Sequence, residues 1–248
     1  MSSSLHNAER QGRDARLLEQ ARDSIVPPLV DTFAVALGRF DDALFDRAER
    51  AGHTQMAYLD AMRELRRRRD EIIARFRAHL VKAWQSLESG DPLSMESALA
   101  DSSHTLSLVT DQELESRLAA RNLASVILRD CKPVLARLDR RLGWIAGNLV
   151  LDNDHNPIGP EHIGVAVHEA FATCELSMEV RLVVIKLCER DLVPGIAKLY
   201  EALDQRLVAL GVIPEMPAAR SPARAPSRES QAEQDSAEDD EASAPAWA

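Results

Sequence analysis

Apolar residues recur at three- and four-residue steps over most of the chain, the spacing that places them on one face of an α-helix. One such stripe begins at Leu29 and ends before Gly52. A longer one, from about Thr54 to Leu87, predicts a single helix of roughly 50 Å, a length that usually requires a long partner helix. No stretch shows sustained two-residue alternation. We therefore expect an all-α protein, a helical bundle of about six to eight helices including one long helix.

Prolines and capping residues divide this pattern into separate helices. A proline fits the first turn of a helix, where its missing N–H costs nothing. The segment Thr110–Glu113 predicts a capping box, and Ser177 is expected to cap the helix that follows it. The prolines that we expect to begin new helices are Pro27-Pro28, Pro133, Pro160 and Pro194.

Composition divides the chain into five regions. The polar residues 1–13 and the Pro-, Ala-, Ser- and acid-rich residues 214–248 are expected to be disordered, because neither can bury enough apolar surface to fold alone. A turn-rich connector over residues 89–105 separates two expected helical subdomains, residues 14–88 with the long helix and residues 106–213.

Charge and targeting signals narrow the class of protein. The tail at 214–248 carries eight acidic residues against three arginines, so about half of the net charge of −10 lies there. The remaining body is also acidic, which argues against wholesale wrapping of nucleic acid. The N-terminus has no apolar signal segment, and no run approaches the ~18 apolar residues of a membrane span. We expect a cytoplasmic protein without membrane contact.

The long predicted helix contains a run of four arginines, Arg66 to Arg69. Four consecutive helical residues point around the whole circumference, so they cannot form one flat basic face. One interpretation pairs an arginine with an acid at a helix interface and leaves its neighbours solvated. The alternatives are contact with phosphate or nucleic acid, or a polar layer that sets the register of a helical dimer. The candidate interaction residues are Arg63, Arg66, Arg67, Arg68 and Arg69.

Two groups of residues approach metal-binding patterns without completing them. Asp152, Asp154 and Asn156 match the first ligand spacings of an EF-hand loop, but Ile163 stands where the bidentate glutamate belongs. A polar loop explains the same residues. The residues that suggest a zinc site are His155, His162, His168 and Cys174. The second histidine of an HExxH motif is missing, so we predict neither a metal nor a cofactor.

Reactive constellations are also missing from the sequence. It contains no GxSxG elbow, Walker loop or GxGxxG motif. The three cysteines, Cys131, Cys174 and Cys188, have no redox or metal spacing and are expected to be buried free thiols. We therefore expect no catalytic residues and no enzymatic activity.

Two functions remain open at this point. The first is a non-enzymatic helical interaction or regulatory adaptor module that binds a protein partner or forms a homodimer. The second is a regulator that binds nucleic acid or an anionic nucleotide through the basic run Arg63–Arg69.

Three stretches of the sequence together resemble a known family. They are FDDALFDRAER with AMRELRRRRDEI, then LSLVTDQELE, and then NPIGPEHI followed by the segment from Met178 to Glu215. In this order they resemble the N-terminal portion of the domain-of-unknown-function 1631 family of proteobacterial proteins, over about Leu17 to Glu215. The resemblance implies a bacterial, cytosolic, helix-rich protein without established catalytic residues. Family members are commonly much longer, and some are labelled thymidine phosphorylase. That label does not transfer, because the sequence shows no phosphate-binding architecture.

Overall fold

The computed structural model describes residues 2–102 and 111–212, with the side chains of 2–13, 100–113 and 116 excepted. Every regular element in these ranges is helical, which confirms the all-α prediction. The tail at 214–248 and the cap residue Thr110 lie outside the described residues. The elements are α1 (Ser2–Gly38), α2 (Phe40–Arg50), the 3-10 helix η1 (Gly52–Thr54), α3 (Gln55–Arg67), α4 (Arg69–Glu88), α5 (Met95–Ser102), α6 (Asp111–Ile145), α7 (Pro160–Ala170) and α8 (Met178–Ala209).

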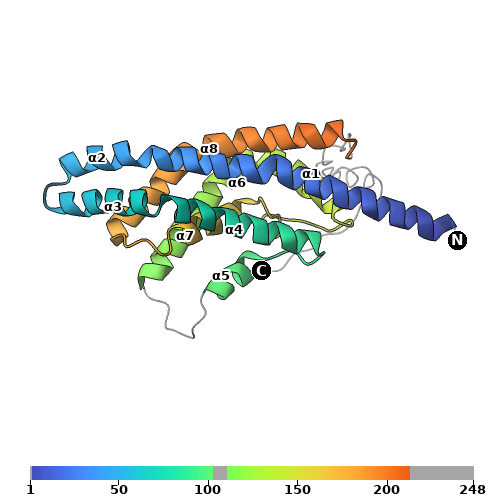
Figure 1. Cartoon of the computed structure of the whole chain (residues 1–248), viewed down its shortest axis with the longest axis horizontal. Helices are drawn as coiled ribbons and strands as arrows, with labels where there is room; N and C mark the ends of the chain where they lie inside the picture. The colour runs from blue at the N-terminus through green and yellow to red at the C-terminus, as the bar shows by residue number, and fades with distance from the viewer. Residues whose placement is uncertain (1, 103–110, 213–248) are drawn as a thin grey trace, which may run out of the picture. The chain divides into compact units, whose positions relative to one another are not determined.

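Helices from both ends of the sequence share one core. α1 runs beside α8, α6 packs along both α7 and α8, and α4 packs against α7 and α1 (Figure 1). At the centre, Phe33 of α1 stacks on Phe76 of α4 with ring centroids 4.1 Å apart. Phe171, after α7, meets Phe33 edge-on at 6.1 Å.

Residues 1–214 consequently form one compact unit, and the expected division into subdomains 14–88 and 106–213 is wrong. The reason is that neither half covers its own apolar faces. Those of α1 and α4 are buried against α8 and α7, so separating the halves would expose the centre of a single hydrophobic cluster.

Two segments that we expected to lack structure are helical. α1 begins at Ser2, within the expected disordered residues 1–13. Extending a helix that the buried Leu17 and Leu18 already anchor costs little, since each added residue gains a hydrogen bond. The expected connector 89–105 contains α5.

The first turn of α5 is fixed by two side chains. The Met95 N–H donates to Asp154 Oδ1 at 2.8 Å. The Ser97 N–H donates to Oγ of Ser94 at 3.2 Å. These contacts satisfy amide groups that a helix start leaves without intrahelical partners, and Asp154 supplies one of them from a loop far along the sequence.

Prolines break fewer helices than expected. Of the prolines expected to begin a helix, Pro160 alone does so, at the start of α7. α1, α6 and α8 each run through their internal prolines, at positions 27–28, 133 and 194. A proline removes one backbone hydrogen bond, and the packing on both sides of it holds the helix together. Beside Pro194, a Cβ placed on Gly195 would lie 2.4 Å from Cγ2 of Thr32, which shows how closely α8 approaches α1.

The predicted long helix is, in contrast, interrupted. α3 ends at Arg67 and α4 begins at Arg69. Between them, Arg68 has φ −103° and ψ 12°, outside the helical range. The single helix expected from Thr54 to Leu87 is therefore wrong, and its break falls inside the arginine run.

Candidate functional site

The five candidate arginines lie on three consecutive parts of the chain. Arg63, Arg66 and Arg67 lie near the C-terminal end of α3, Arg68 lies at the break, and Arg69 begins α4. The break therefore divides the arginine run between two helices.

Arg66 and Arg69 connect α3 and α4 to the preceding helices. Nε of Arg66 lies 2.8 Å from Oδ2 of Asp41 on α2. Nη2 of Arg69 donates to the carbonyl oxygen of Ala34 on α1 at 3.1 Å. Both guanidinium groups sit at the surface, where such contacts set geometry more than stability.

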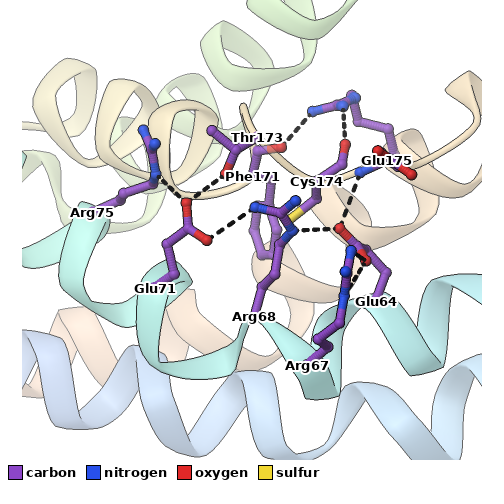
Figure 2. Close-up of polar contacts among 10 residues, drawn as sticks. Glu64, Arg67, Arg68, Glu71, Arg75, Phe171, Thr173, Cys174 and Glu175 are labelled. Atoms are coloured by element: carbon purple, nitrogen blue, oxygen red, sulfur yellow. Dashed lines mark hydrogen bonds and ion pairs between the residues drawn. The ribbon is translucent and has the colours of Figure 1, made fainter.

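The central arginines converge on Glu64, a glutamate that is 8% exposed. Oε2 of Glu64 accepts hydrogen bonds from Nε and Nη2 of Arg67, and Oε1 accepts one from Nε of Arg68 at 2.6 Å (Figure 2). Oε1 also accepts the backbone N–H of Glu175, at 3.4 Å. The Arg67 hydrogen bond, followed by the Arg68 bond, lowers the pKa of Glu64 in spite of its burial.

A second glutamate continues this network along α4. Oε2 of Glu71 accepts from Nη1 of Arg68 at 3.0 Å. Oε1 accepts from Oγ1 of Thr173 at 3.0 Å and from Nε of Arg75 at 3.1 Å. The Thr173 hydrogen bond contributes most to lowering the pKa of Glu71. Arg68 therefore bridges the helix break, with one carboxylate on each side of it.

The segment between α7 and α8 is held from its other side by Arg181 of α8. Its guanidinium donates to the carbonyl oxygens of Phe171 at 3.0 Å and Cys174 at 3.1 Å. Figure 2 shows Thr173, Cys174 and Glu175 of this segment beside the glutamates of α3 and α4. We call the set Glu64, Arg67, Arg68, Glu71, Thr173 and Arg181 the junction network.

The junction network uses its charges internally. Arg67 and Arg68 are paired with acids, as one interpretation of the run expects. The network joins three stretches of the chain through hydrogen bonds to charged groups. The two glutamates at its centre were not singled out in the sequence. Their spacing of three and four residues from the arginines was the available signal.

The loop that resembles an EF-hand uses its oxygens for its own backbone. Oδ1 of Asp152 accepts the N–H groups of Asp154 and His155, each at 3.0 Å. Nδ2 of Asn156 donates to Oδ1 of Asp139 at 2.7 Å, and Oδ1 of Asn156 accepts a backbone N–H. These contacts are the turn and capping roles expected of a polar loop.

The residues that suggested a zinc site have separate partners. His155 lies 2.8 Å from Asp152, whereas the buried His162 contacts His79 of α4. His79, which the sequence did not single out, is also buried. Among the described residues no three His, Cys, Asp or Glu side chains are grouped so that they could hold a metal ion.

The three cysteines are buried free thiols, as predicted. Burial raises the pKa of Cys131 and of Cys174 to about 11, and that of Cys188 further. A thiol with such a pKa is almost entirely protonated at neutral pH and therefore a poor nucleophile.

These features define a class of protein: an all-helical domain whose conspicuous charged residues connect its own helices. None of the described helices combines the length and the apolar character required to cross a membrane. The chain belongs to the family described as "Protein of unknown function (DUF1631) N-terminal domain", whose model matches residues 13–211. The family resemblance read from the sequence is thus confirmed. No curated protein matches the chain, and no solved structure matches it.

Proposed function

We propose that the chain is a non-enzymatic helical interaction module, an adaptor of the cytoplasm that associates with a second copy of itself through the outward face of α4. The observation that carries this proposal is a groove of about 430 Å³ on that helix. We call it the α4 groove; its lining residues are Asp70, Ile73, Ala74, Arg77, Ala78 and Val81.

The α4 groove has the composition of a helix-packing surface. Its residues recur at steps of three and four, so they form one stripe. Ala74 and Ala78 are small and exposed, which allows a second helix to approach closely. Ile73 and Val81 are only partly buried and offer apolar surface at either side.

The charges of the groove complement an antiparallel copy of the same helix. Asp70 and Arg77 are two turns apart on one face. When two such faces meet about a two-fold axis, Asp70 of each copy lies opposite Arg77 of the other, and Ile73 lies opposite the small Ala74. An isologous contact of this kind forms each favourable charge pair twice.

Internal pairing makes the arginine run less suitable for nucleic acid. Arg66, Arg67 and Arg68 already have carboxylate partners, so an incoming phosphate would have to replace an existing ion pair. The buried, protonated thiols likewise offer no nucleophile. Both observations favour the interaction module over the nucleotide regulator and over an enzyme.

Charge exchange across the α4 groove tests this proposal. Asp70→Arg and Arg77→Asp should each lower the molar mass measured by light scattering toward that of a monomer, because each variant places like charges opposite each other. Mixing the two variants should restore the dimer, since residue 70 of one then meets an opposite charge at residue 77 of the other. The double variant should also dimerise.

The matched control is Asp91→Arg, the same charge change at an exposed site just beyond α4. It should dimerise like the unaltered protein. Rescue by mixing separates a lost interface from a misfolded chain. A protein that is monomeric at every concentration, or one whose dimer ignores both single variants, would show that the α4 groove does not join two copies.

A further inference from the structure

A second concave surface lies where the α2–α3 hairpin meets α8. It is a cavity of about 530 Å³, lined by residues from α2, η1, α3 and the first turns of α8. We call it the hairpin cavity. Its volume lies in the range of small-molecule sites, and nothing in the proposed function of the α4 groove uses it.

Three arginines from two helices converge on the hairpin cavity. Arg47 and Arg50 come from the last turns of α2, and Arg190 comes from α8. Among the described residues, no carboxylate lies within ion-pair distance of Arg47 or Arg50, in contrast to the paired arginines of the junction network. Arg190 contacts its neighbour Asp191 through Nε and Nη2, at 2.9 and 2.7 Å.

The cavity also contains two acids, one of which is held in place. Oε1 of Glu179 accepts a hydrogen bond from the hydroxyl of the buried Tyr58 at 2.8 Å. Asp46 is the other. Because Asp191 is paired with Arg190, the positive charge of the lining that has no carboxylate partner among the described residues comes from Arg47 and Arg50.

Part of the lining of the hairpin cavity is apolar. Ala43, Ala51 and Leu187 contribute to it. Arginines in the last turn of a helix are often explained by the helix dipole alone. That explanation accounts for the positions of Arg47 and Arg50 in α2, but it does not account for the apolar side chains that line the cavity beside them.

We infer that the hairpin cavity binds a small organic phosphate ester, with Arg47 and Arg50 around the phosphate and the apolar side chains of the lining against its organic part. A guanidinium group forks to two phosphate oxygens, which suits it to this group more than to a spherical anion. The glutamate held by Tyr58 opposes ligands with higher negative charge, so the site favours a monoester over a polyphosphate.

Isothermal titration with phenyl phosphate, inorganic phosphate and phenol tests this inference. Phenyl phosphate should bind more tightly than inorganic phosphate, because only the ester also contacts the apolar side chains of the lining, and phenol should bind most weakly. Arg47→Gln and Arg50→Gln should each weaken phenyl phosphate binding about tenfold. Raising the ionic strength should weaken it as well.

Arg39→Gln provides the matched control, since it removes an exposed arginine at the opposite end of α2. It should leave binding unchanged. Equal losses in all three variants would point to the net charge of the protein and overturn the site. No binding of either phosphate, or binding that survives the combined Arg47→Gln and Arg50→Gln change in a folded protein, would also overturn it. The molar mass of these variants reports separately on the α4 groove.

Discussion

Nε2 of His79 on α4 lies 3.1 Å from Nδ1 of His162 on α7, and both imidazoles are buried. On its other side, Nε2 of His162 lies 2.9 Å from the carbonyl oxygen of Leu93, which can only accept. Neutral His162 therefore carries its proton on Nε2 and accepts one from His79 through Nδ1. Nδ1 of His79 in turn lies 3.3 Å from Oε2 of Glu169. The buried contacts thus run from Leu93 through both histidines to Glu169.

We expect His162 to remain neutral in the folded protein well below its ordinary titration range. Burial, followed by the neighbouring His79, lowers the pKa of His162 from 6.5 to about 4. Between these values the folded state binds fewer protons than the unfolded state. The free energy of unfolding therefore falls as the pH drops through this window, by at most about 3 kcal/mol. Long-range ¹H–¹⁵N NMR at about pH 5.5 should show Nδ1 of His162 without a proton; a doubly protonated ring there would contradict the prediction.

The Asp139 carboxyl should change the free energy of unfolding with pH in the opposite direction. Burial raises its pKa from 3.8 to about 6, although Asn156 donates a hydrogen bond to it. The folded state then binds more protons than the unfolded state between these values, so stability is lost as the pH rises through them. Asp139→Asn keeps an acceptor for Asn156 and should raise the free energy of unfolding at neutral pH by about 1–2 kcal/mol. Below the ordinary carboxylate pKa the gain should disappear.

One experiment can separate the opposing contributions of Asp139 and His162 to the pH dependence of stability. Urea denaturation of the unaltered protein at a series of pH values between about 4 and 6 should show a shallow dependence of stability on pH, because the slopes of Asp139 and His162 oppose each other. Asp139→Asn should reveal the steeper loss on acidification that His162 causes. Parallel curves for both proteins would show that the Asp139 carboxyl does not titrate in this window.

The junction network should stabilise the fold through its buried carboxylate. Glu64→Gln keeps the shape but weakens hydrogen bonds from Arg67 and Arg68, and we expect a loss of about 1–2 kcal/mol in urea denaturation. The matched control is Asp60→Asn, whose pair with Arg63 is exposed on both sides and should contribute less than about 0.5 kcal/mol.

The pH dependence of the Glu64→Gln effect provides a further check. The pKa of Glu64 is lowered in the folded state, so its contribution is present at neutral pH and is lost as acid protonates the folded carboxylate. The difference between the variant and the unaltered protein should shrink accordingly. Equal effects of the Glu64 and Asp60 variants at neutral pH would mean that the junction network positions the α7–α8 segment without stabilising it.

The apolar pattern was sufficient to predict the helices but not their continuity. We expected breaks at Pro133 and Pro194, where the helices continue, and none at Arg68, where one occurs. Proline reports a local preference of the backbone, whereas continuity is decided by packing such as that of Gly195 on Thr32. These contacts join positions far apart in the sequence and leave no periodic signal.

The candidate site was predictable to a similar extent. The pairing of Glu64 with arginines three and four residues later follows from helical spacing. The partners that give the network its role, such as Thr173 for Glu71, come from a segment about a hundred residues away in sequence and could not be found without the fold. The same holds for Arg190, which reaches the cavity beside Arg47 from another helix.

The approach of α7 to α6 gives a last, independent prediction. A Cβ on Gly164 would lie 2.7 Å from the carbonyl oxygen of Ala120, a backbone atom that cannot rotate away. Gly164→Ala must therefore push the two helices apart, which should cost about 1–3 kcal/mol in urea denaturation. Because His162 precedes Gly164 in the same helix, the displacement should also weaken its hydrogen bond to His79 and change the imidazole NMR signals. The matched control is Gly38→Ala, whose added methyl group would meet only the end of the Arg69 side chain at 3.8 Å and should be nearly neutral. Equal stabilities for the two variants would show that α6 and α7 can separate at no cost, and that the buried histidine contact does not depend on their close packing.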